Sequence, residues 1–136
     1  MERIVINTQA TKAIGTLPLN VNGQDHDIRF GFESLEEFKR TVQLSIKAQS
    51  LLTSIANKNV SEDPVGMLDA YEEVSRIYRD ILKILLGVTA YGDLTAIIGD
   101  NFPIVTSQPI ISAIAELYSD YYKSISAGYL DARNKL

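Results

Sequence analysis

Cysteine is absent from this chain of 136 residues, and histidine occurs once. The lack of cysteine excludes disulfide frameworks, thiolate nucleophiles and zinc sites built from cysteine. The sequence also lacks the Gly-x-Gly-x-x-Gly and Gly-Lys-Ser/Thr motifs that cradle phosphates. A carboxylate di-metal bundle needs a Glu-x-x-His pair on each of two helices, which one histidine cannot supply. We therefore expect no enzyme, no cofactor and no bound metal.

Basic residues are missing from a long internal stretch. No Lys or Arg occurs between Lys83 and Lys123, and residues 84–115 carry only Asp93 and Asp100 as charges. The net charge of −4 disfavours binding to nucleic acid, because phosphate contacts need a surplus of basic residues. We expect the low-charge stretch to form a packed helix pair or a subunit interface.

Targeting and membrane signals are lacking too. The N-terminus has neither the basic region nor the longer apolar run of a signal peptide. A membrane-spanning helix needs about 20 consecutive, mostly apolar residues, whereas Gly87, Gly92, Gly99 and Pro103 interrupt the low-charge stretch. We therefore expect an intracellular protein that does not enter a membrane.

Hydrophobic residues make up 46% of the sequence, which is enough for a real core. A chain of this length fits one domain. We predict a single domain, 1–136, with a β-hairpin region at 1–33 and a helical body at 34–136. The expected fold class is α+β, mainly α, with the hairpin packed on three long helices and one short helix.

Residues 19–32 read as two short strands joined by a tight turn. Asn22-Gly23 suits a two-residue hairpin turn, because both central positions of that turn need positive φ. One face of the second strand is apolar through Ile28, Phe30 and Phe32.

The first strand is expected within 14–21, and residues 4–6 are a candidate third strand. Pro18 places the first strand at an edge or puts the proline at its start, because proline cannot donate to the ladder. A lone hairpin is marginal in water and leaves its edges unpaired, so it needs a cover from its own helices or from a neighbouring copy.

A capping box opens the first helix, with Ser34 at the N-cap and Glu37 three residues later. We expect this helix to end near Ala56. Ser61 or Asp63 caps the second helix, which Gly92 should end. The predicted buried stripe of the first helix is Leu35, Phe38, Val42, Ile46 and then Leu52 or Ile55. That of the second helix is Leu68, Tyr71, Val74, Tyr78, Ile81, Leu82 and Leu85.

A short helix is expected from Asp93 to Ile98, and the last long helix from a cap at Thr106 or Ser107. Pro109 then falls in its first turn, a favourable place for proline. The apolar residues of this helix are Ile110, Ile111, Ile114, Leu117, Tyr118, Tyr121, Tyr122, Ile125 and Tyr129.

His26 lies between Asp25 and Asp27, next to the predicted turn. A histidine flanked by carboxylates suits a general base or a metal ligand. Such residues are also common in polar turns, where they form local hydrogen bonds. Catalysis further needs a nucleophile and a pocket, and the sequence indicates neither, so we interpret His26 as a loop residue.

All seven tyrosines lie in the C-terminal half, and the last helix carries Tyr118, Tyr121, Tyr122 and Tyr129. These four are the candidate protein-binding residues, because tyrosine is enriched at interfaces. Tyr121 and Tyr122 are about 100° apart on a helix, so both cannot point into one core. The alternative is a core whose tyrosine hydroxyls lie at its rim.

The order of an Asn-Gly hairpin, the strand Ile-Arg-Phe-Gly-Phe and then Ser-Leu-Glu-Glu-Phe opening a helical body resembles the tail assembly chaperones of long-tailed bacteriophages of Gram-positive bacteria. The match at residue level covers about 21–38. The resemblance implies a non-enzymatic protein of the host cytoplasm. It would bind and solubilise the tape-measure protein and assist polymerisation of the tail-tube protein.

An intracellular adaptor or regulatory domain that binds a partner helix would have the same sequence features and stays open as an alternative. For either role we expect a homo-oligomer, formed through the hairpin edge or the last helix. We place the client surface on the weakly charged region from Ile84 through the tyrosine-bearing helix.

Overall fold

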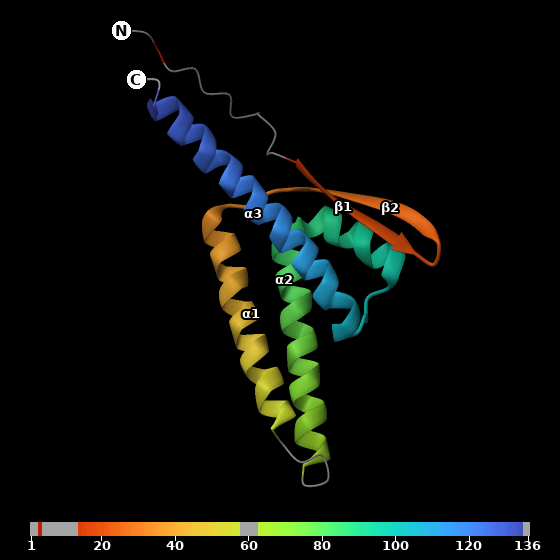
Figure 1. Cartoon of the computed structure of the whole chain (residues 1–136). Helices are drawn as coiled ribbons and strands as arrows, with labels where there is room; N and C mark the ends of the chain where they lie inside the picture. The colour runs from red at the N-terminus through yellow and green to blue at the C-terminus, as the bar shows by residue number, and fades with distance from the viewer. Residues whose placement is uncertain (1–2, 4–13, 58–62, 135–136) are drawn as a thin grey trace.

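The computed structural model describes residue 3 and residues 14–57 and 63–134. A two-stranded antiparallel hairpin comes first, and three helices follow it (Figure 1). The elements are β1 (Ile14–Val21), β2 (Gln24–Gly31), α1 (Leu35–Ala56), α2 (Pro64–Ile98) and α3 (Ile104–Asn134). The fold is therefore α+β and mainly α, as predicted.

The hairpin turn is the one that the sequence predicts. Asn22 and Gly23 have φ angles of 53° and 84°, and Val21 pairs with Gln24 across the turn. The inward face is apolar, with Leu17 opposite Ile28, and both side chains are buried. The candidate third strand at 4–6 lies outside the described residues.

His26 lies within β2, opposite Leu19, and not in a loop as the sequence suggested. The two-residue turn is so tight that pairing starts at Gln24 and includes both neighbours of the histidine. Pro18 lies in β1, and one edge of this strand has no partner strand in the described sheet. Its missing N–H is tolerated at such an edge.

The helix α1 begins and ends as predicted. The Ser34 hydroxyl accepts a hydrogen bond from the Glu37 N–H at 3.3 Å, and the helix ends at Ala56. The predicted stripe is correct for Ile55, which is buried, and for Phe38, which packs against the core, but it is wrong elsewhere. Its residues Leu35, Val42 and Ile46 are exposed. The buried residues of this helix are Thr41, Ala48 and Ile55, because α1 turns this narrower side toward α2.

The break in α2 is at Gly87, not at Gly92 as predicted. Asp63 caps the helix by accepting a hydrogen bond from the Gly66 N–H at 3.0 Å. The chain then runs as helix to Ile98, apart from Gly87, which has φ 80° and ψ 172°. That conformation is essentially confined to glycine. Gly92 continues the helix, so the expected short helix from Asp93 is the last part of the segment that follows the break.

The helix α3 begins at Ile104, before the caps expected at Thr106 or Ser107. The Pro103 carbonyl accepts hydrogen bonds from both of those N–H groups, at 3.0 and 3.1 Å. Pro109 consequently lies inside the helix rather than in its first turn.

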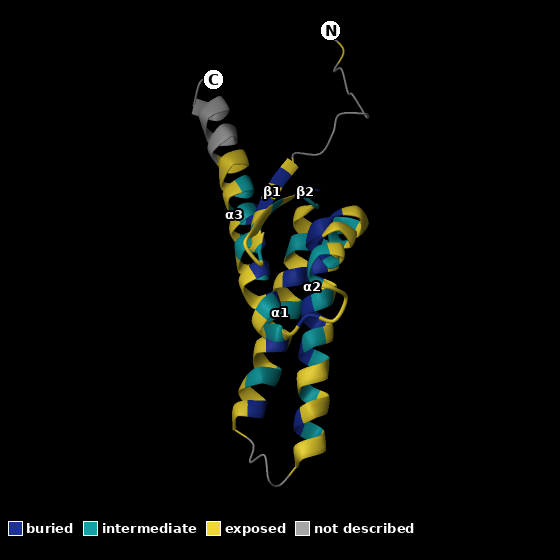
Figure 2. Cartoon of the chain, turned by 90° about the vertical axis from the view of Figure 1, so that its right-hand side faces the viewer, coloured by how far each residue is buried: buried dark blue, intermediate teal, exposed yellow. Residues whose placement is uncertain are grey.

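The helices α1 and α2 run antiparallel, and α3 crosses them beside the hairpin (Figure 1). In their lower part α1 and α2 stand alone, with buried residues on the sides that face each other (Figure 2). We call this two-helix part, formed by the end of α1 and the start of α2, the stalk. At the opposite end, the C-terminal part of α3 extends past the body (Figure 1). The core lies between these ends, where α2, α3 and the hairpin meet.

Candidate protein-interaction surfaces

An aromatic cluster joins the hairpin to α1 and α3. The Tyr118 ring lies between two phenylalanine rings, stacked on Phe38 with centroids 5.1 Å apart and on Phe30 at 6.0 Å. Phe32 contacts the same ring edge-on at 4.9 Å. One side chain of α3 therefore holds the second strand and the start of α1 together.

The Tyr118 hydroxyl bonds two backbone groups. It donates to the Leu85 carbonyl at 2.6 Å and accepts from the Glu33 N–H at 3.0 Å. Leu85 comes two residues before the break at Gly87, where the last carbonyls of a helical segment need partners from outside it. Burial raises the pKa of the Tyr118 hydroxyl to about 12. Tyr118 is completely buried, so its ring is part of this chain's own core.

Tyr121 and Tyr122 both face their own chain, although the sequence predicted that one of them must leave the core. Tyr121 stacks on Phe32 at 4.3 Å with the rings nearly parallel. The Tyr122 hydroxyl donates to the Glu33 carbonyl at 2.7 Å, and burial raises its pKa. Both side chains are half-buried. The link between β2 and α1 passes beside α3 and meets both rings. Tyr129 lies on α3 beyond the side chains that the structure describes.

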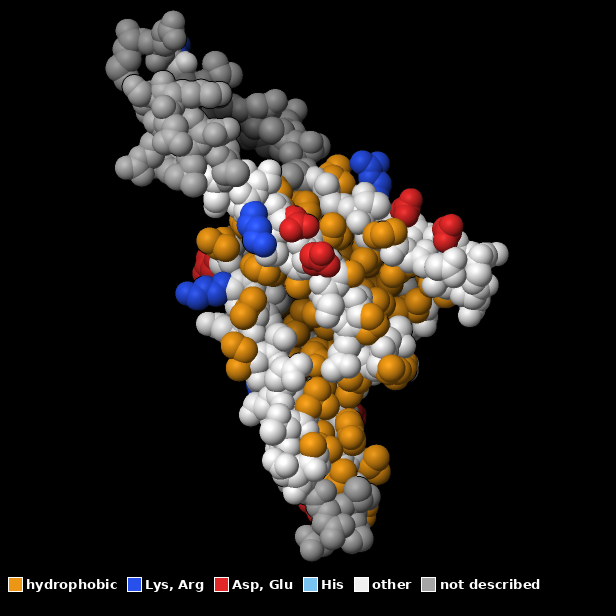
Figure 3. All heavy atoms as spheres, viewed as in Figure 1, with side chains coloured by type: hydrophobic (Ala, Val, Ile, Leu, Met, Phe, Trp, Pro, Cys, Tyr) orange, Lys and Arg blue, Asp and Glu red, His pale blue; other side chains and the backbone are white. Residues whose placement is uncertain are grey.

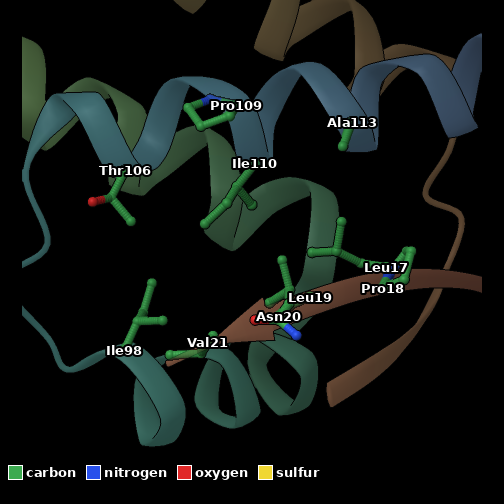
Figure 4. A pocket seen from close by; sticks show the side chains of 10 residues that line it. All are labelled: Leu17, Pro18, Leu19, Asn20, Val21, Ile98, Thr106, Pro109, Ile110 and Ala113. Carbon is green, nitrogen blue, oxygen red and sulfur yellow. The ribbon is translucent and has the colours of Figure 1, made fainter. Parts of the chain in front are cut away.

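A hollow lies between β1, the end of α2 and the first turns of α3 (Figure 4). Its cavity volume is about 320 Å³. Leu19 and Ile98 point into it from one side, and Ile110 points toward them from α3 (Figure 4). We call this space the hairpin–α3 hollow. Its lining residues are Leu17, Pro18, Leu19, Asn20, Val21, Ile98, Thr106, Pro109, Ile110 and Ala113.

No charged side chain is among the residues that line the hairpin–α3 hollow. Leu19, Val21 and Ile98 are half-buried, so apolar area at the mouth stays open to solvent. Pro109 has no N–H, which deprives the Val105 carbonyl of its helical donor four residues on. The hollow thus offers an apolar surface with few polar groups, which suits an apolar side chain of another protein.

A second, smaller groove runs between α1 and α3, with a volume of about 160 Å³. Val42 and Ile46 line it from α1, and Ile111 and Ala115 from α3. Figure 3 shows hydrophobic side chains gathered along this face and down the stalk, with most of the visible charges near its upper part and edges.

From the sequence, His26 was also a candidate general base or metal ligand. The described residues contain no group of three or more His, Asp and Glu side chains close enough to hold a metal ion. His26 is half-buried on the face of β2 that carries Ile28.

Within the part of the chain that the structure describes, one helix, α2, is long and apolar enough to cross a membrane, with a mean hydropathy of 1.7 over its most apolar window. Core helices of soluble proteins pass the same test. The apolar stretch 81–98 is also divided by the non-helical backbone at Gly87.

Comparisons of this chain with protein-family models, with curated proteins and with solved structures find no match. The resemblance to tail assembly chaperones thus rests on the short motifs within 21–38, and the functional argument rests on the surfaces described above.

Proposed function

We propose that this chain is a non-enzymatic chaperone that binds an apolar helical segment of a client protein. On the resemblance within 21–38, the client is a phage tape-measure protein, held in the host cytoplasm while tail-tube subunits assemble around it. The observation that carries the binding role is the hairpin–α3 hollow, which is open, apolar and uncharged.

The size of the hollow suits a side-chain anchor. Small-molecule sites range over roughly 300–1,000 Å³, so about 320 Å³ is small for a cofactor and sufficient for an apolar side chain of a docked helix. Amphipathic helices commonly bind in this manner, with anchors at spacings of three or four residues. The absence of Lys and Arg between Lys83 and Lys123 leaves this part of the chain with few charged groups to desolvate when an apolar helix binds.

The acidic balance of the chain supports the chaperone role further. A net charge of −4 lies in the range that keeps small proteins apart in solution. A long apolar client covered by such molecules would therefore gain solubility. An adaptor would use the same hollow, but it would not be expected to change the solubility of a tape-measure protein.

Co-expression with a tape-measure protein tests the proposal. We expect the client to become soluble and to be recovered with the tagged chain. Val21→Asp and Ile98→Asp, which each place a charge in the hollow, should reduce the recovered client at least tenfold. Circular dichroism and thermal unfolding of each variant would show that the fold persists.

Val88→Asp is the matched control, because Val88 lies on the same segment of α2 as Ile98 and is 93% exposed. It should leave recovery of the client unchanged. An insoluble client in the presence of the wild-type chain would refute the chaperone role. Equal recovery with folded Val21→Asp and Ile98→Asp variants would show that the hollow is not the binding surface.

A further inference from the structure

The two sides of the α1–α2 pair differ in charge. On one side, Lys47 of α1 forms an ion pair with Glu73 of α2 at 3.9 Å, and Arg76 bonds the same carboxylate at 3.1 Å. The other side meets α3, where Gln108 donates a hydrogen bond to the Tyr78 hydroxyl at 3.4 Å. Glu73 and Tyr78 are about 140° apart around α2. We call the continuation of the Tyr78 side along the stalk the stalk face.

The helix α2 contributes two apolar side chains to the stalk face. Tyr71 lies seven residues before Tyr78, and Leu68 lies three residues before Tyr71, so all three are on nearly the same side of α2. Tyr78 is buried, whereas Tyr71 is 43% exposed and Leu68 is 68% exposed. Apolar surface on this side of the stalk is therefore open to solvent.

The helix α1 contributes uncharged side chains. Ser45 and Ile46 line the groove against α3, and Gln49, Leu52 and Thr53 follow within two turns on the same side. The Thr53 hydroxyl donates to the Gln49 carbonyl at 3.0 Å, so its hydrogen bond is made within the helix. In Figure 3, hydrophobic side chains continue down the stalk. The centre of the stalk face is thus apolar or uncharged.

Acidic side chains border the stalk face. Residues 63–75 include four carboxylates and no Lys or Arg, and the one charged residue of 45–57 is Lys47, which pairs with Glu73. Asp69 is next to Leu68 in the sequence, and Glu72 follows one turn after it. Both carboxylates are exposed, and among the described residues neither forms an ion pair.

This charge selects the occupant of the stalk face. Two copies of the chain that met through their stalk faces would bring like charges together, which disfavours contact. An amphipathic helix with Lys and Arg beside its apolar stripe would instead cover Leu68 and Tyr71 and place its cations near Asp69 and Glu72. Such helices bind in grooves through apolar residues spaced by three or four.

We propose that the stalk face binds a basic amphipathic helix of another protein, which completes a three-helix bundle with α1 and α2. Leu68 and Tyr71 contact the apolar stripe of this helix, and Glu72 attracts its cations. The proposal does not depend on the client of the hairpin–α3 hollow, because none of the residues that line the hollow takes part in the stalk face.

A pair of synthetic helical peptides tests the proposal. The probe has about 18 residues, a length of about 27 Å, with leucines and one tryptophan on one side and lysines beside them. The matched peptide has glutamate in place of every lysine. The chain contains no tryptophan, so the fluorescence of the peptide reports binding without background. We expect the lysine peptide to bind the full chain saturably, and the glutamate peptide to bind at least tenfold more weakly.

Variants of the chain locate the contact. Leu68→Asn should weaken binding of the lysine peptide at least tenfold, whereas Val88→Asn, at a position of α2 that is 93% exposed, should leave it unchanged. Glu72→Lys should weaken binding severalfold. Asp80→Lys makes the same change of charge at an exposed position of α2, on the side away from Tyr78, and should have little effect. Circular dichroism would show that each variant folds.

Several outcomes would overturn the proposal. Among them are a lysine peptide that does not bind, one that binds no better than the glutamate peptide, and binding that survives in folded Leu68→Asn. Equal losses for Glu72→Lys and Asp80→Lys would show attraction by net charge alone. Loss of binding in Ile98→Asp would assign the peptide to the hairpin–α3 hollow. A dimer of the free chain in sedimentation equilibrium that Leu68→Asn abolishes would assign the stalk face to a second copy.

Discussion

Removing a single oxygen atom tests how this fold is held together. Tyr118→Phe keeps the aromatic ring between Phe30 and Phe38 but deletes the hydroxyl that bonds the Leu85 carbonyl and the Glu33 N–H. The variant should fold, because its packing is unchanged. It should also be clearly less stable, because the buried Leu85 carbonyl loses its donor next to the helix break.

The expected loss follows from two hydrogen bonds. A buried polar group left without its partner costs about 1–3 kcal/mol, and a typical hydrogen bond contributes about 0.5–1.5 kcal/mol net. We therefore expect Tyr118→Phe to lower the free energy of unfolding by about 2–4 kcal/mol, measured by urea denaturation at pH 7. The slope against urea should not change, because the exposed surface of both states stays similar.

Tyr122→Phe is the matched control, because it deletes the same atom from the same helix. Its hydroxyl makes one bond, to the Glu33 carbonyl, from a half-buried position where water can replace it. The loss should be about 0.5–1.5 kcal/mol. Losses for Tyr118→Phe and Tyr122→Phe that agree within about 0.5 kcal/mol would refute the reasoning that the Tyr118 hydroxyl fastens the break in α2.

Alkaline pH provides a second test of the same hydroxyl. Burial raises the pKa of Tyr118 to about 12 in the folded chain, against an ordinary value near 10 when unfolded. Between these values the folded state holds more protons than the unfolded state, so stability falls as pH rises from about 10 to 12. Two units correspond to at most about 2.7 kcal/mol. Tyr118→Phe should lose this part of the decline and keep the smaller one from Tyr91 and Tyr122, whose pKa values are also raised.

The features that sequence reasoning predicted correctly depend on local chemistry. Asn22-Gly23 alone satisfies the positive φ of the turn, and Ser34 and Asp63 each accept a hydrogen bond from an N–H three residues later. Each of these signals is complete within a few residues. The positions of the turn and of the two helix N-caps therefore do not depend on residues distant in the sequence.

The predictions that were wrong depend on which other parts of the chain pack against each helix or strand. Gly87 and Gly92 are equivalent in a one-dimensional pattern, and the break falls at Gly87, where Tyr118 reaches the Leu85 carbonyl from another helix. Helical periodicity likewise placed Leu68 and Ile46 in buried stripes, but it could not show that the fold leaves both side chains exposed. An apolar stripe shows which side of a helix is apolar, but it does not show what packs against that side.

For the candidate surfaces too, some features could be predicted from the sequence and others depend on the tertiary fold. The tyrosines of α3 were located from sequence, but their partners Phe32, Phe38 and Glu33 come from a link that only the tertiary fold brings beside them. The hairpin–α3 hollow could not be predicted, because its walls lie at 17–21, 98 and 106–113. These three walls come together because the break at Gly87 sets the direction of the helical segment that follows it.

Further predictions concern four single substitutions. Asp63→Ala should lower stability by about 0.5–2 kcal/mol in urea denaturation, because the Gly66 N–H loses its cap. Lys47→Ala should change stability by less than about 1 kcal/mol, and less still in high salt, because its ion pair with Glu73 is solvent-exposed at 3.9 Å. Gly87→Ala should lower stability by about 1–2 kcal/mol. An alanine Cβ meets nothing within 4 Å there, so the loss comes from the φ of 80°, at about 1–3 kcal/mol, offset by about 0.4–1 kcal/mol from a less flexible unfolded chain. Gly92→Ala, exposed and helical on the same segment with equally open space, should instead raise stability by about 0.5–1 kcal/mol. Opposite signs for these two substitutions would place the break of α2 at Gly87, whereas stabilisation by both would show that the helix runs through it.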